Sequence, residues 1–356
     1  MKKYILGFNK IDSEKARLEV EKLAFGPFAF QAARILKKRG ILNAVEKGGK
    51  KGKTLEEIKD AVDMSKYGIS ILLDAAESIG AVKIKKDRFA ITKMGSLLLY
   101  DKVADIHFNL TQHVCYQGMY FLEDSIDNKK PEGLKVFGDW ETIYDAVPHL
   151  PDKSKSSWLN FDHFFSSRSF PEALPIVFSN KPKKILDIGG NTGKWAIKCA
   201  SYNPDVAITI ADLPDQLNDA EKYIKNSPYS DRIDFFPINL LDHIKELPAN
   251  YDAIWMSQFL DCFQPDDIIS ILKRAKNSLN ENGRIYIMDL FVDKQSYNIA
   301  RYCLNMVTLY FTALANGKSR MYHFSDMINF IEKAGLRVVK NYKKIGMAHS
   351  ILKVSV

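Results

Sequence analysis

The second half of the chain alternates short apolar runs with longer amphipathic stretches. From Lys183 onward, apolar residues with helical spacing separate five runs rich in β-branched and aromatic residues: KKILDI, VAITIAD, RIDFFPI, YDAIWMS and GRIYIMDL. Strands that alternate with helices in this way favour an open, mostly parallel sheet with helices on both faces. The pattern therefore predicts an α/β, Rossmann-like domain over residues 151–356.

The first 150 residues follow a different pattern. TLEEIKDAV begins with Thr54 and Glu57 at capping-box spacing, and KYGISILLDAAESIG is a second amphipathic helix that ends at Gly80. AVKIKKDRFAIT predicts two short strands around a Lys-Asp turn, followed by another helix. This order is that of a winged helix, so residues 1–150 are predicted to form a helical domain that contains one. The Pro-, Gly- and Lys-rich segment NKKPEGLKVFGDWETIYDAVPHLPDK is the expected inter-domain connection.

Winged helices often bind DNA, and the second helix of the motif would enter the major groove. Between Lys66 and Ile79 this helix has one lysine against Asp74 and Glu77, which is typical of a packing helix. The net charge of +8 comes from short, scattered lysine clusters. We therefore expect no nucleic-acid partner, although a DNA-binding regulator with a ligand-sensing domain stays open as an alternative. The apolar helical segments at 20–45 and 104–130 favour packing against the wing domain or a second chain.

Composition limits the remaining classes of protein. With 46% apolar and 26% charged residues the chain is typical of globular proteins, and no apolar run approaches the roughly 18 to 20 residues that span a bilayer. The start MKKYILGFNKIDSEKA is not a convincing secretion signal. The four cysteines are far apart with no CxxC pair, so neither a metal site nor a disulfide framework is expected. A cytoplasmic location with no membrane partner follows.

A glycine-rich loop, LDIGGNTGKWA, follows the first predicted strand. A Walker A loop needs four residues between its first Gly and the Gly-Lys pair, whereas three separate Gly189 from Gly193, and Trp195 follows Lys194. The dinucleotide fingerprint needs glycine where Asn191 stands. Neither phosphate-binding motif fits this loop.

The pattern that remains is D-x-G-x-x-x-G, formed by Asp187, Gly189 and Gly193, with Asp212 at the end of the second strand. A carboxylate at Asp212 can accept both ribose hydroxyls, and one at Asp187 can lie near a positively charged group. Two acids around a glycine loop suit a cationic nucleoside without a phosphate. S-adenosylmethionine fits this description.

At this point the chain resembles the small-molecule O-methyltransferases of the plant phenol and bacterial hydroxyindole or polyketide type. The resemblance covers nearly the whole chain and includes the winged-helix region, GDWETI, AVPHLPDK, NFDHFFSSRS, ILDIGGNTG, IADLP, INLLD, GRIYIMDL, NGKSR and FIEKAGL. It implies a class I methyltransferase domain with a mostly parallel seven-stranded sheet and an N-terminal domain that makes a homodimer. It also implies S-adenosylmethionine-dependent methylation, expected on oxygen, of a small aromatic acceptor.

The loop and the resemblance together give the expected cofactor-binding residues. They are Ser169, Asp187, Gly189, Gly190, Gly193, Asp212, Leu213, Asn239, Leu240 and Ser257. Two of these depart from the family, which usually has Asp in place of Asn239 and often Lys in place of Ser257. The expected substrate-lining residues, suited to a flat ring, are His113, Phe161, Phe165, Met306 and Tyr310.

One departure from the family concerns the catalytic base. The resemblance places Asp261 where most members have a general-base His, with Asp289 at one acidic partner of that His and Ser319 at the other. With reference pKa values of about 3.9 and 6.5, an unperturbed Asp makes proton removal from a phenol roughly 3.5 kcal/mol harder. Burial among apolar neighbours can raise the pKa of Asp261 and restore its strength as a base.

Three hypotheses follow from this departure. In the first, Asp261 is the base of a hydroxyl methyltransferase and Asp289 supports it, so these two are the predicted catalytic residues. In the second, the acceptor is an amine, a carboxylate or an acidic phenol, and catalysis is mainly proximity. In the third, the domain binds S-adenosylmethionine but does other chemistry or none.

Overall fold

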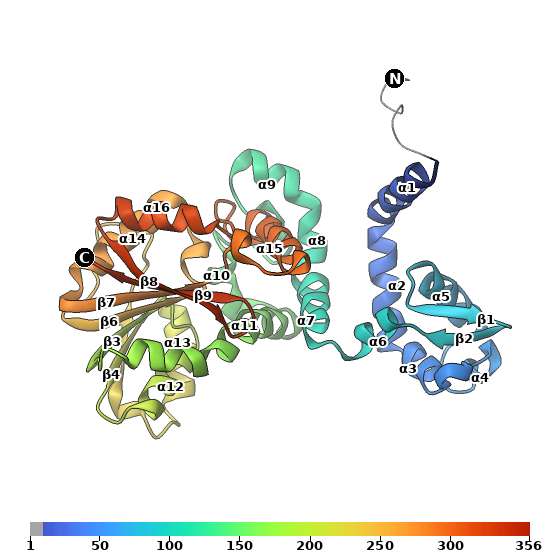
Figure 1. Cartoon of the computed structure of the whole chain (residues 1–356), viewed down its shortest axis with the longest axis horizontal. Helices are drawn as coiled ribbons and strands as arrows, with labels where there is room; N and C mark the ends of the chain where they lie inside the picture. Colours follow the sequence, from blue (N-terminus) through green and yellow to red (C-terminus); the bar gives the residue numbers. More distant parts are fainter. Residues whose placement is uncertain (1–9) are drawn as a thin grey trace. The chain divides into compact units, whose positions relative to one another are not determined.

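The computed structural model describes residues 10–356. The chain divides into two compact units, with the boundary between Asn109 and Leu110. Figure 1 traces both units by sequence colour.

The N-terminal unit has the predicted order of two helices, a hairpin and a further helix. The capping box is confirmed, because the Thr54 hydroxyl accepts a hydrogen bond from the Glu57 amide and the Glu57 carboxylate accepts one from the Thr54 amide. Lys86 and Asp87 have φ angles of 50° and 57°, as a tight two-residue hairpin turn requires. The elements are α1 (Lys10–Ala24), α2 (Gly26–Lys38), α3 (Ile41–Glu46), η1 (Gly49–Lys51), α4 (Leu55–Lys59), α5 (Lys66–Ser78), β1 (Val82–Lys85), β2 (Arg88–Ile91), α6 (Lys93–Tyr100) and α7 (Lys102–Leu110).

The C-terminal unit contains a seven-stranded sheet in the order β5-β4-β3-β6-β7-β9-β8. The strands are β3 (Lys184–Ile188), β4 (Ala207–Asp212), β5 (Ile233–Pro237), β6 (Tyr251–Ser257), β7 (Leu279–Asp289), β8 (Arg337–Ile345) and β9 (His349–Ser355). The first five pair in parallel, and β9 pairs antiparallel with both β7 and β8. All five strands expected from the sequence are confirmed, as is the mostly parallel sheet.

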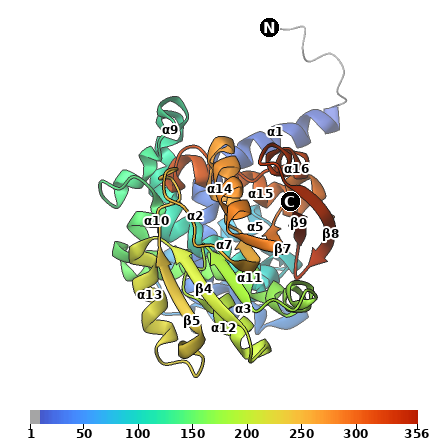
Figure 2. The ribbon, with the colours of Figure 1, turned by 90° about the vertical axis from the view of Figure 1, so that its left-hand side faces the viewer.

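Alternating side chains place a hydrophobic cluster on each face of this sheet. Ile185 and Trp255 face one cluster, whereas Leu186 and Ile254 face the other. The first face packs against α11 (Asp152–Phe178), α12 (Lys194–Tyr202) and α13 (Pro214–Ile224), and the second against α14 (Pro265–Asn277) and α16 (Phe324–Lys333). Figure 1 shows α14 and α16 on the opposite side of the sheet from α12 and α13, and Figure 2 shows α12 and α13 beside β4 and β5.

Residues 110–150 belong to the C-terminal unit, which corrects the boundary predicted at residue 150. Leu134, Ile143 and Val147 are buried in a third cluster together with Leu290 and Leu314. The segment that the sequence presented as a linker is therefore packed structure. The elements of this cluster are η2 (Thr111–Cys115), α8 (Tyr116–Gly118), η3 (Met119–Phe121), α9 (Leu122–Asn128), η4 (Glu132–Val136), α10 (Ile143–Ala146), η5 (Val147–His149), η8 (Val292–Lys294), α15 (Asn298–Tyr310) and η9 (Phe311–Ala315).

The glycines of this segment allow close backbone approach. A Cβ on Gly133 would lie 2.3 Å from the Gly118 carbonyl oxygen and 2.7 Å from the Ala313 carbonyl oxygen. Both obstacles are backbone atoms, so neither can rotate away as a side chain can. The glycine content that suggested a flexible connection instead reflects tight packing of η4 against α8 and η9.

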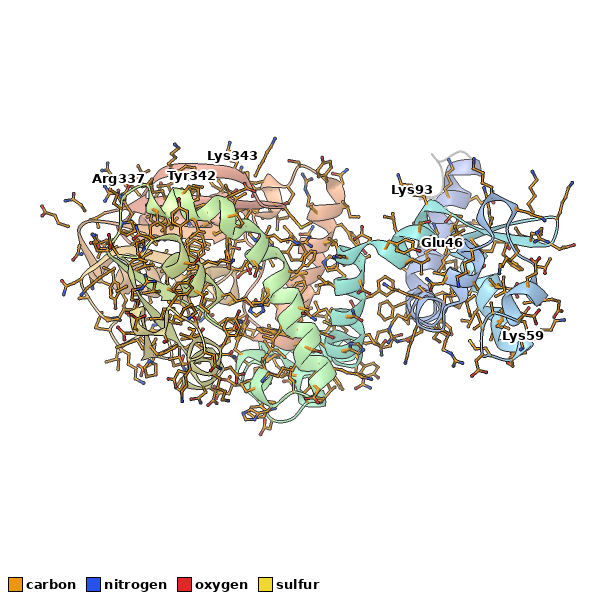
Figure 3. The ribbon with its side chains drawn as sticks, turned by 90° about the horizontal axis from the view of Figure 1, so that it is seen from below. Glu46, Lys59, Lys93, Arg337, Tyr342 and Lys343 are labelled. Atoms are coloured by element: carbon orange, nitrogen blue, oxygen red, sulfur yellow. The ribbon has the colours of Figure 1, made fainter. Side chains whose placement is uncertain are left out.

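The outer strand β8 carries charged residues at the edge of the sheet. Arg337 and Lys343 are exposed, and Figure 3 shows their side chains projecting from the ribbon. Charged side chains on an edge strand discourage pairing with another chain.

Within residues 10–356, no helix is both long enough and apolar enough to cross a membrane. The cysteines are free thiols, and no group of three or more His, Cys, Asp or Glu residues in the same range is placed to hold a metal ion.

Replacement of Gly133 by Ala tests the assignment of residues 110–150 to the packed unit. We expect Gly133→Ala to lower the free energy of unfolding by about 1 to 3 kcal/mol, because the added methyl group meets fixed backbone atoms. Chemical denaturation measures this change. Gly26→Ala is the matched control, since a Cβ there has nothing within 4 Å. Equal stability of the two variants contradicts the assignment.

Candidate active site

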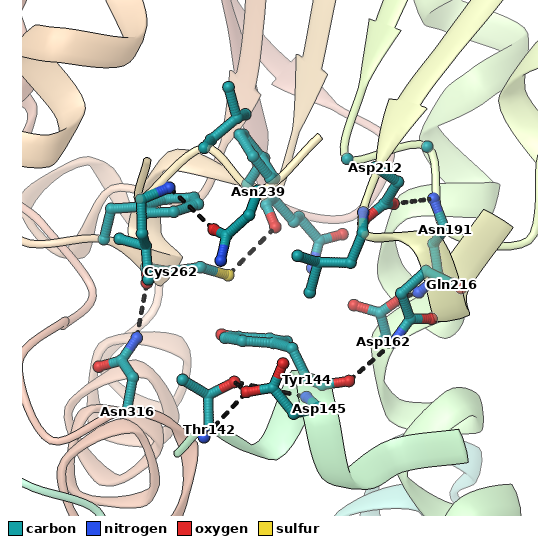
Figure 4. Close-up of a pocket in the computed structure, with 18 of the residues that line it drawn as sticks. Thr142, Tyr144, Asp145, Asp162, Asn191, Asp212, Gln216, Asn239, Cys262 and Asn316 are labelled. Atoms are coloured by element: carbon teal, nitrogen blue, oxygen red, sulfur yellow. Dashed lines mark hydrogen bonds between the residues drawn. The ribbon is translucent and has the colours of Figure 1, made fainter. Parts of the chain in front are cut away.

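A cavity of about 1010 Å³ lies in the C-terminal unit at the carboxyl ends of β3, β4, β5 and β6. Its wall comes from the loops that follow these strands, from α11 and from the segment between Lys129 and Asp145. Ligands of open α/β sheets bind at this end of the strands. Figure 4 shows a close-up of part of its lining.

The glycine loop after β3 forms one wall. Gly189 has a φ angle of +72°, and a Cβ there would lie 2.2 Å from the Phe259 ring. A Cβ on Gly190 would lie 2.7 Å from Asp187 Oδ2, so Gly190 leaves this carboxylate room. Both positions therefore favour glycine, because a Cβ would collide with the Phe259 ring at Gly189 and with the Asp187 carboxylate at Gly190.

Asp187 and Asp212 lie beside this loop in different states of hydrogen bonding. Asp187 is 2% exposed, and its Oδ2 has no hydrogen-bond partner among the described residues. Burial, together with the nearby charge of Asp212, raises the pKa of Asp187 well above its usual value. Asp212 accepts hydrogen bonds from the Asn191 amide at 2.9 Å and the Leu213 amide at 2.7 Å. Burial outweighs these bonds and raises the pKa of Asp212 to about 6.

The structure places eight of the ten predicted cofactor residues in the cavity wall. They are Asp187, Gly189, Gly190, Asp212, Leu213, Asn239, Leu240 and Ser257. Contacts of these residues with a ligand stay predictions.

The other two predicted cofactor residues, Ser169 and Gly193, lie outside the wall. Ser169 is fully buried, and its hydroxyl lies 3.0 Å from His349 Nδ1 and donates to the Phe165 carbonyl oxygen. Gly193 begins α12 with a φ angle of +76°, and a Cβ there would lie 2.4 Å from Ile224 Cδ1. Gly193 therefore lies outside the cavity wall and allows the loop to pack closely against Ile224.

Helix α11 faces the cavity with a stripe of residues four positions apart: Trp158, Asp162, Ser166 and Phe170. Residues at this spacing share one helix face. The predicted substrate residues Phe161 and Phe165 lie one position before members of the stripe and are not in the wall. Their rings pack against each other, with centroids 6.2 Å apart. These two predicted substrate residues therefore lie on the neighbouring face of α11.

The remaining predicted substrate residues also lie outside the wall. Tyr310 is buried behind Trp158, whose Nε1 donates a hydrogen bond of 2.7 Å to the Tyr310 hydroxyl. His113 lies with its Nδ1 2.8 Å from the Ser157 hydroxyl, and Met306 is 44% exposed on α15.

Asp162 is a functional candidate that the sequence analysis missed. It lines the cavity, and its Oδ2 accepts a hydrogen bond of 3.0 Å from the Asn191 side chain (Figure 4). Burial raises the pKa of Asp162 to about 7, and the charge of Asp261 adds to the effect. The spacing of four from Trp158 was the signal in the sequence that could have identified it.

His163 and Lys194 form a second polar group beside Asp162. Lys194 Nζ lies 2.9 Å from His163 Nδ1, and His163 Nε2 lies 3.3 Å from the Thr192 hydroxyl. Burial lowers the pKa of His163 to about 4, so this imidazole is neutral at physiological pH. Because Lys194 can only donate, Nδ1 accepts and Nε2 carries the proton.

The predicted catalytic pair lies behind the cavity wall. Asp261 and Asp289 are 3% and 2% exposed, and neither lines the cavity. Cys262 stands in the wall, with its thiol 3.5 Å from Asp261 Oδ1. Burial raises the pKa of Asp261 to about 6. Burial and then the charge of Asp261 raise the pKa of Asp289 well above its usual value.

The opposite wall comes from residues 129–145, part of the segment that the sequence predicted to be a linker. Tyr144 lines the cavity from α10, and its carbonyl oxygen accepts a hydrogen bond of 3.0 Å from the Gln216 side chain. On the side of Cys262, Asn316 donates a hydrogen bond of 2.6 Å to the Cys262 carbonyl oxygen. Figure 4 shows Tyr144 and Gln216 together, and Asn316 beside Cys262.

Two family models match the chain. Residues 17–89 match a Dimerisation2-like domain, and residues 173–337 match an O-methyltransferase domain. The chain is an S-adenosylmethionine-dependent methyltransferase that contains an O-methyltransferase domain.

This methyltransferase is similar to proteins with different acceptors. It is 26% identical over 329 residues to the L-tyrosine C(3)-methyltransferase of Streptomyces lavendulae, covering 90% of this chain and 88% of the relative. The mitomycin 7-O-methyltransferase MmcR has the same fold, with a TM-score of 0.73, 17% identity, and coverage of 98% and 99% of the two chains. An O-methyltransferase from neocarzinostatin biosynthesis, in complex with S-adenosylmethionine and a naphthoic acid, matches with a TM-score of 0.62 and 16% identity over 92% and 95%.

S-adenosylmethionine is the cofactor of this methyltransferase, and the cavity wall fits it. Asp187 Oδ2, Asn191 Oδ1 and Ser257 Oγ are buried polar atoms without partners among the described residues. The cofactor offers donors to such atoms through its ammonium and ribose hydroxyl groups. Buried polar atoms without partners are costly, so their presence at this wall favours a polar, cationic ligand.

The variant Asp187→Asn tests two effects of this carboxylate: its cost to the stability of the ligand-free protein and its contribution to cofactor binding. Because the pKa of Asp187 is raised in the folded state, its ionisation costs stability at neutral pH, and this cost falls as pH falls. We expect Asp187→Asn to raise the free energy of unfolding of the ligand-free protein by about 1 kcal/mol near neutral pH. We expect the same variant to weaken S-adenosylmethionine binding at least about tenfold. Denaturation and calorimetry measure the two effects, and a variant that binds the cofactor normally contradicts the role of Asp187.

Proposed function

We propose that this methyltransferase transfers the methyl group of S-adenosylmethionine to a hydroxyl group of a small aromatic molecule. The observation that carries this proposal is one cavity that joins a cofactor wall of glycine and carboxylates to a wall of aromatic side chains. Its volume of about 1010 Å³ is at the upper end of small-ligand sites, which run from about 300 to 1,000 Å³. A cofactor and a small acceptor fit in this space together.

The aromatic wall supports a flat acceptor. Trp140, Tyr144, Trp158, Phe259 and Phe263 all line the cavity. Aromatic side chains bind flat rings through stacked and edge-to-face contacts. The bound cofactor supplies an electrophilic methyl group, and the protein then has to position the acceptor and receive its proton.

Methylation of a ring carbon is a second candidate reaction. The relative from Streptomyces lavendulae is named as a methyltransferase acting at C3 of tyrosine. Both reactions begin with loss of a phenol proton, because the phenolate is the better nucleophile at oxygen and at the neighbouring carbon. The same cavity and the same proton acceptor therefore serve either outcome.

We expect the enzyme to act as a homodimer through its N-terminal unit. Residues 17–89 match a dimerisation domain, and Leu23, Phe25 and Phe28 expose 78%, 58% and 71% of their surfaces. Exposed apolar surface of this kind marks an interface. Light scattering should give a mass of twice 40.6 kDa, and a monomeric mass at working concentrations contradicts this proposal.

Methyl transfer is tested with a cofactor labelled with carbon-13 in its methyl group. The enzyme is incubated with catechol, 3,4-dihydroxybenzoate, 5-hydroxyindole or L-tyrosine. We expect a labelled product from at least one of these phenols, and the carbon shift of its methyl group tells O-methylation from C-methylation.

Two outcomes overturn the proposal. Labelled product from amines or carboxylic acids alone supports an acceptor that needs no strong base. Calorimetric binding of the cofactor without any product across a wide acceptor library supports a binding protein that does not methylate.

A further inference from the structure

We infer that Asp162, which lines the cavity, receives the acceptor's proton, and that Asp261, which lies outside the cavity wall, does not. This inference rests on the proposed methyl transfer. It reassigns the catalytic role that the family resemblance gave to Asp261.

Position is the first reason for this assignment. Asp162 lines the cavity and keeps 30% of its side chain exposed, whereas Asp261 is 3% exposed and Cys262 stands in the wall next to it. A general base has to come within hydrogen-bond reach of the proton it removes. Of the two carboxylates, Asp162 is the one that a molecule in the cavity can touch.

The hydrogen bonds of Asp162 leave one oxygen available. Oδ2 accepts from the Asn191 side chain at 3.0 Å, and the Asn191 amide in turn donates to Asp212. Oδ1 has no hydrogen-bond partner among the described residues. The glycine loop therefore fixes the orientation of the carboxylate and leaves Oδ1 to accept a proton.

Charged groups on several elements act on Asp162. Asp261 and Asp212 disfavour its ionisation, and Lys194 favours it. The neutral His163 ring lies 3.7 Å from Oδ2. Burial is the largest influence, and the balance leaves Asp162 with a pKa of about 7. The carboxyl group thus exchanges its proton near physiological pH.

The charge of the cofactor completes the argument. A sulfonium near Asp162 favours the ionised carboxylate, so a bound cofactor prepares the base. During transfer the acceptor's proton passes to Asp162, and the oxygen's electron pair forms the bond to the methyl carbon. The methyl–sulfur bond breaks, and its electron pair stays on sulfur as a neutral thioether. The site loses one positive and one negative charge together, so the transfer leaves its net charge unchanged.

Proton linkage in calorimetry tests this inference without any acceptor. S-adenosylmethionine and S-adenosylhomocysteine differ by one methyl group and one positive charge. Binding of each is measured at about pH 7 in phosphate and in Tris, whose ionisation enthalpies differ, to count the protons released. Because Asp162 is about half protonated at this pH, we expect the charged ligand to release about half a proton more per chain than the neutral one.

Three variants identify the groups responsible. Asp162→Asn should abolish the difference between the two ligands, and Asp162→Glu should retain part of it. Asp261→Asn should keep a difference but move its midpoint to lower pH, because a neighbouring negative charge is removed. Asp231→Asn is the matched control, since Asp231 is exposed and outside the cavity wall, and it should behave as the parent.

Activity with the best phenol of the panel gives a second readout. Asp162→Asn should lower kcat at least about 100-fold with less change in KM, whereas Asp261→Asn should lower it less. Equal proton release for the two ligands, or an undiminished difference in Asp162→Asn, overturns the inference even if methylated product forms. Absence of product with an intact proton difference overturns the proposed function instead.

Discussion

Five carboxyl groups gather around the carboxyl ends of the parallel strands with little positive charge to balance them. Asp187, Asp212, Asp261 and Asp289 lie at or near the carboxyl ends of β3, β4, β6 and β7, and Asp162 joins them from α11. None of the five forms an ion pair with a lysine or arginine within residues 10–356. Burial raises the pKa of every one of them. Ionising these carboxyl groups is therefore costly in the ligand-free enzyme, and a cationic ligand lowers that cost.

Hydrophobic packing in the rest of the fold offsets the free-energy cost of burying these five carboxyl groups. Hydrophobic clusters cover both faces of the sheet, and a third cluster fixes α11 and residues 110–150 around the cavity. Apolar burial of this extent offsets the cost of a few ionised groups. S-adenosylmethionine carries two positive charges, one on its sulfonium and one on its ammonium group. A site with Asp187 beside the glycine loop and Asp162 on α11 offers a carboxyl group to each of them.

The sequence predicted features whose causes are local. Strand periodicity gave β3 to β7, the Thr54 capping box marked the start of α4, and the spacing of Gly189 and Gly193 excluded phosphate loops. Features that depend on distant contacts were missed. Pro and Gly between residues 129 and 150 suggested a linker, whereas Gly133 serves close packing against Gly118. Likewise, only the orientation of α11 tells which face meets the cavity and that Asp162 rather than Phe161 lines it.

The most direct test of this account is the stability of the enzyme with and without S-adenosylmethionine as pH changes. Since the carboxyl groups have raised pKa values in the folded state, ligand-free stability should fall as pH rises from about 4, near the unfolded-state pKa of Asp, to about 7. Over the same range the stabilisation produced by S-adenosylmethionine should grow, and that produced by S-adenosylhomocysteine should grow less. Stabilisation by the two ligands that is equal and independent of pH contradicts the account.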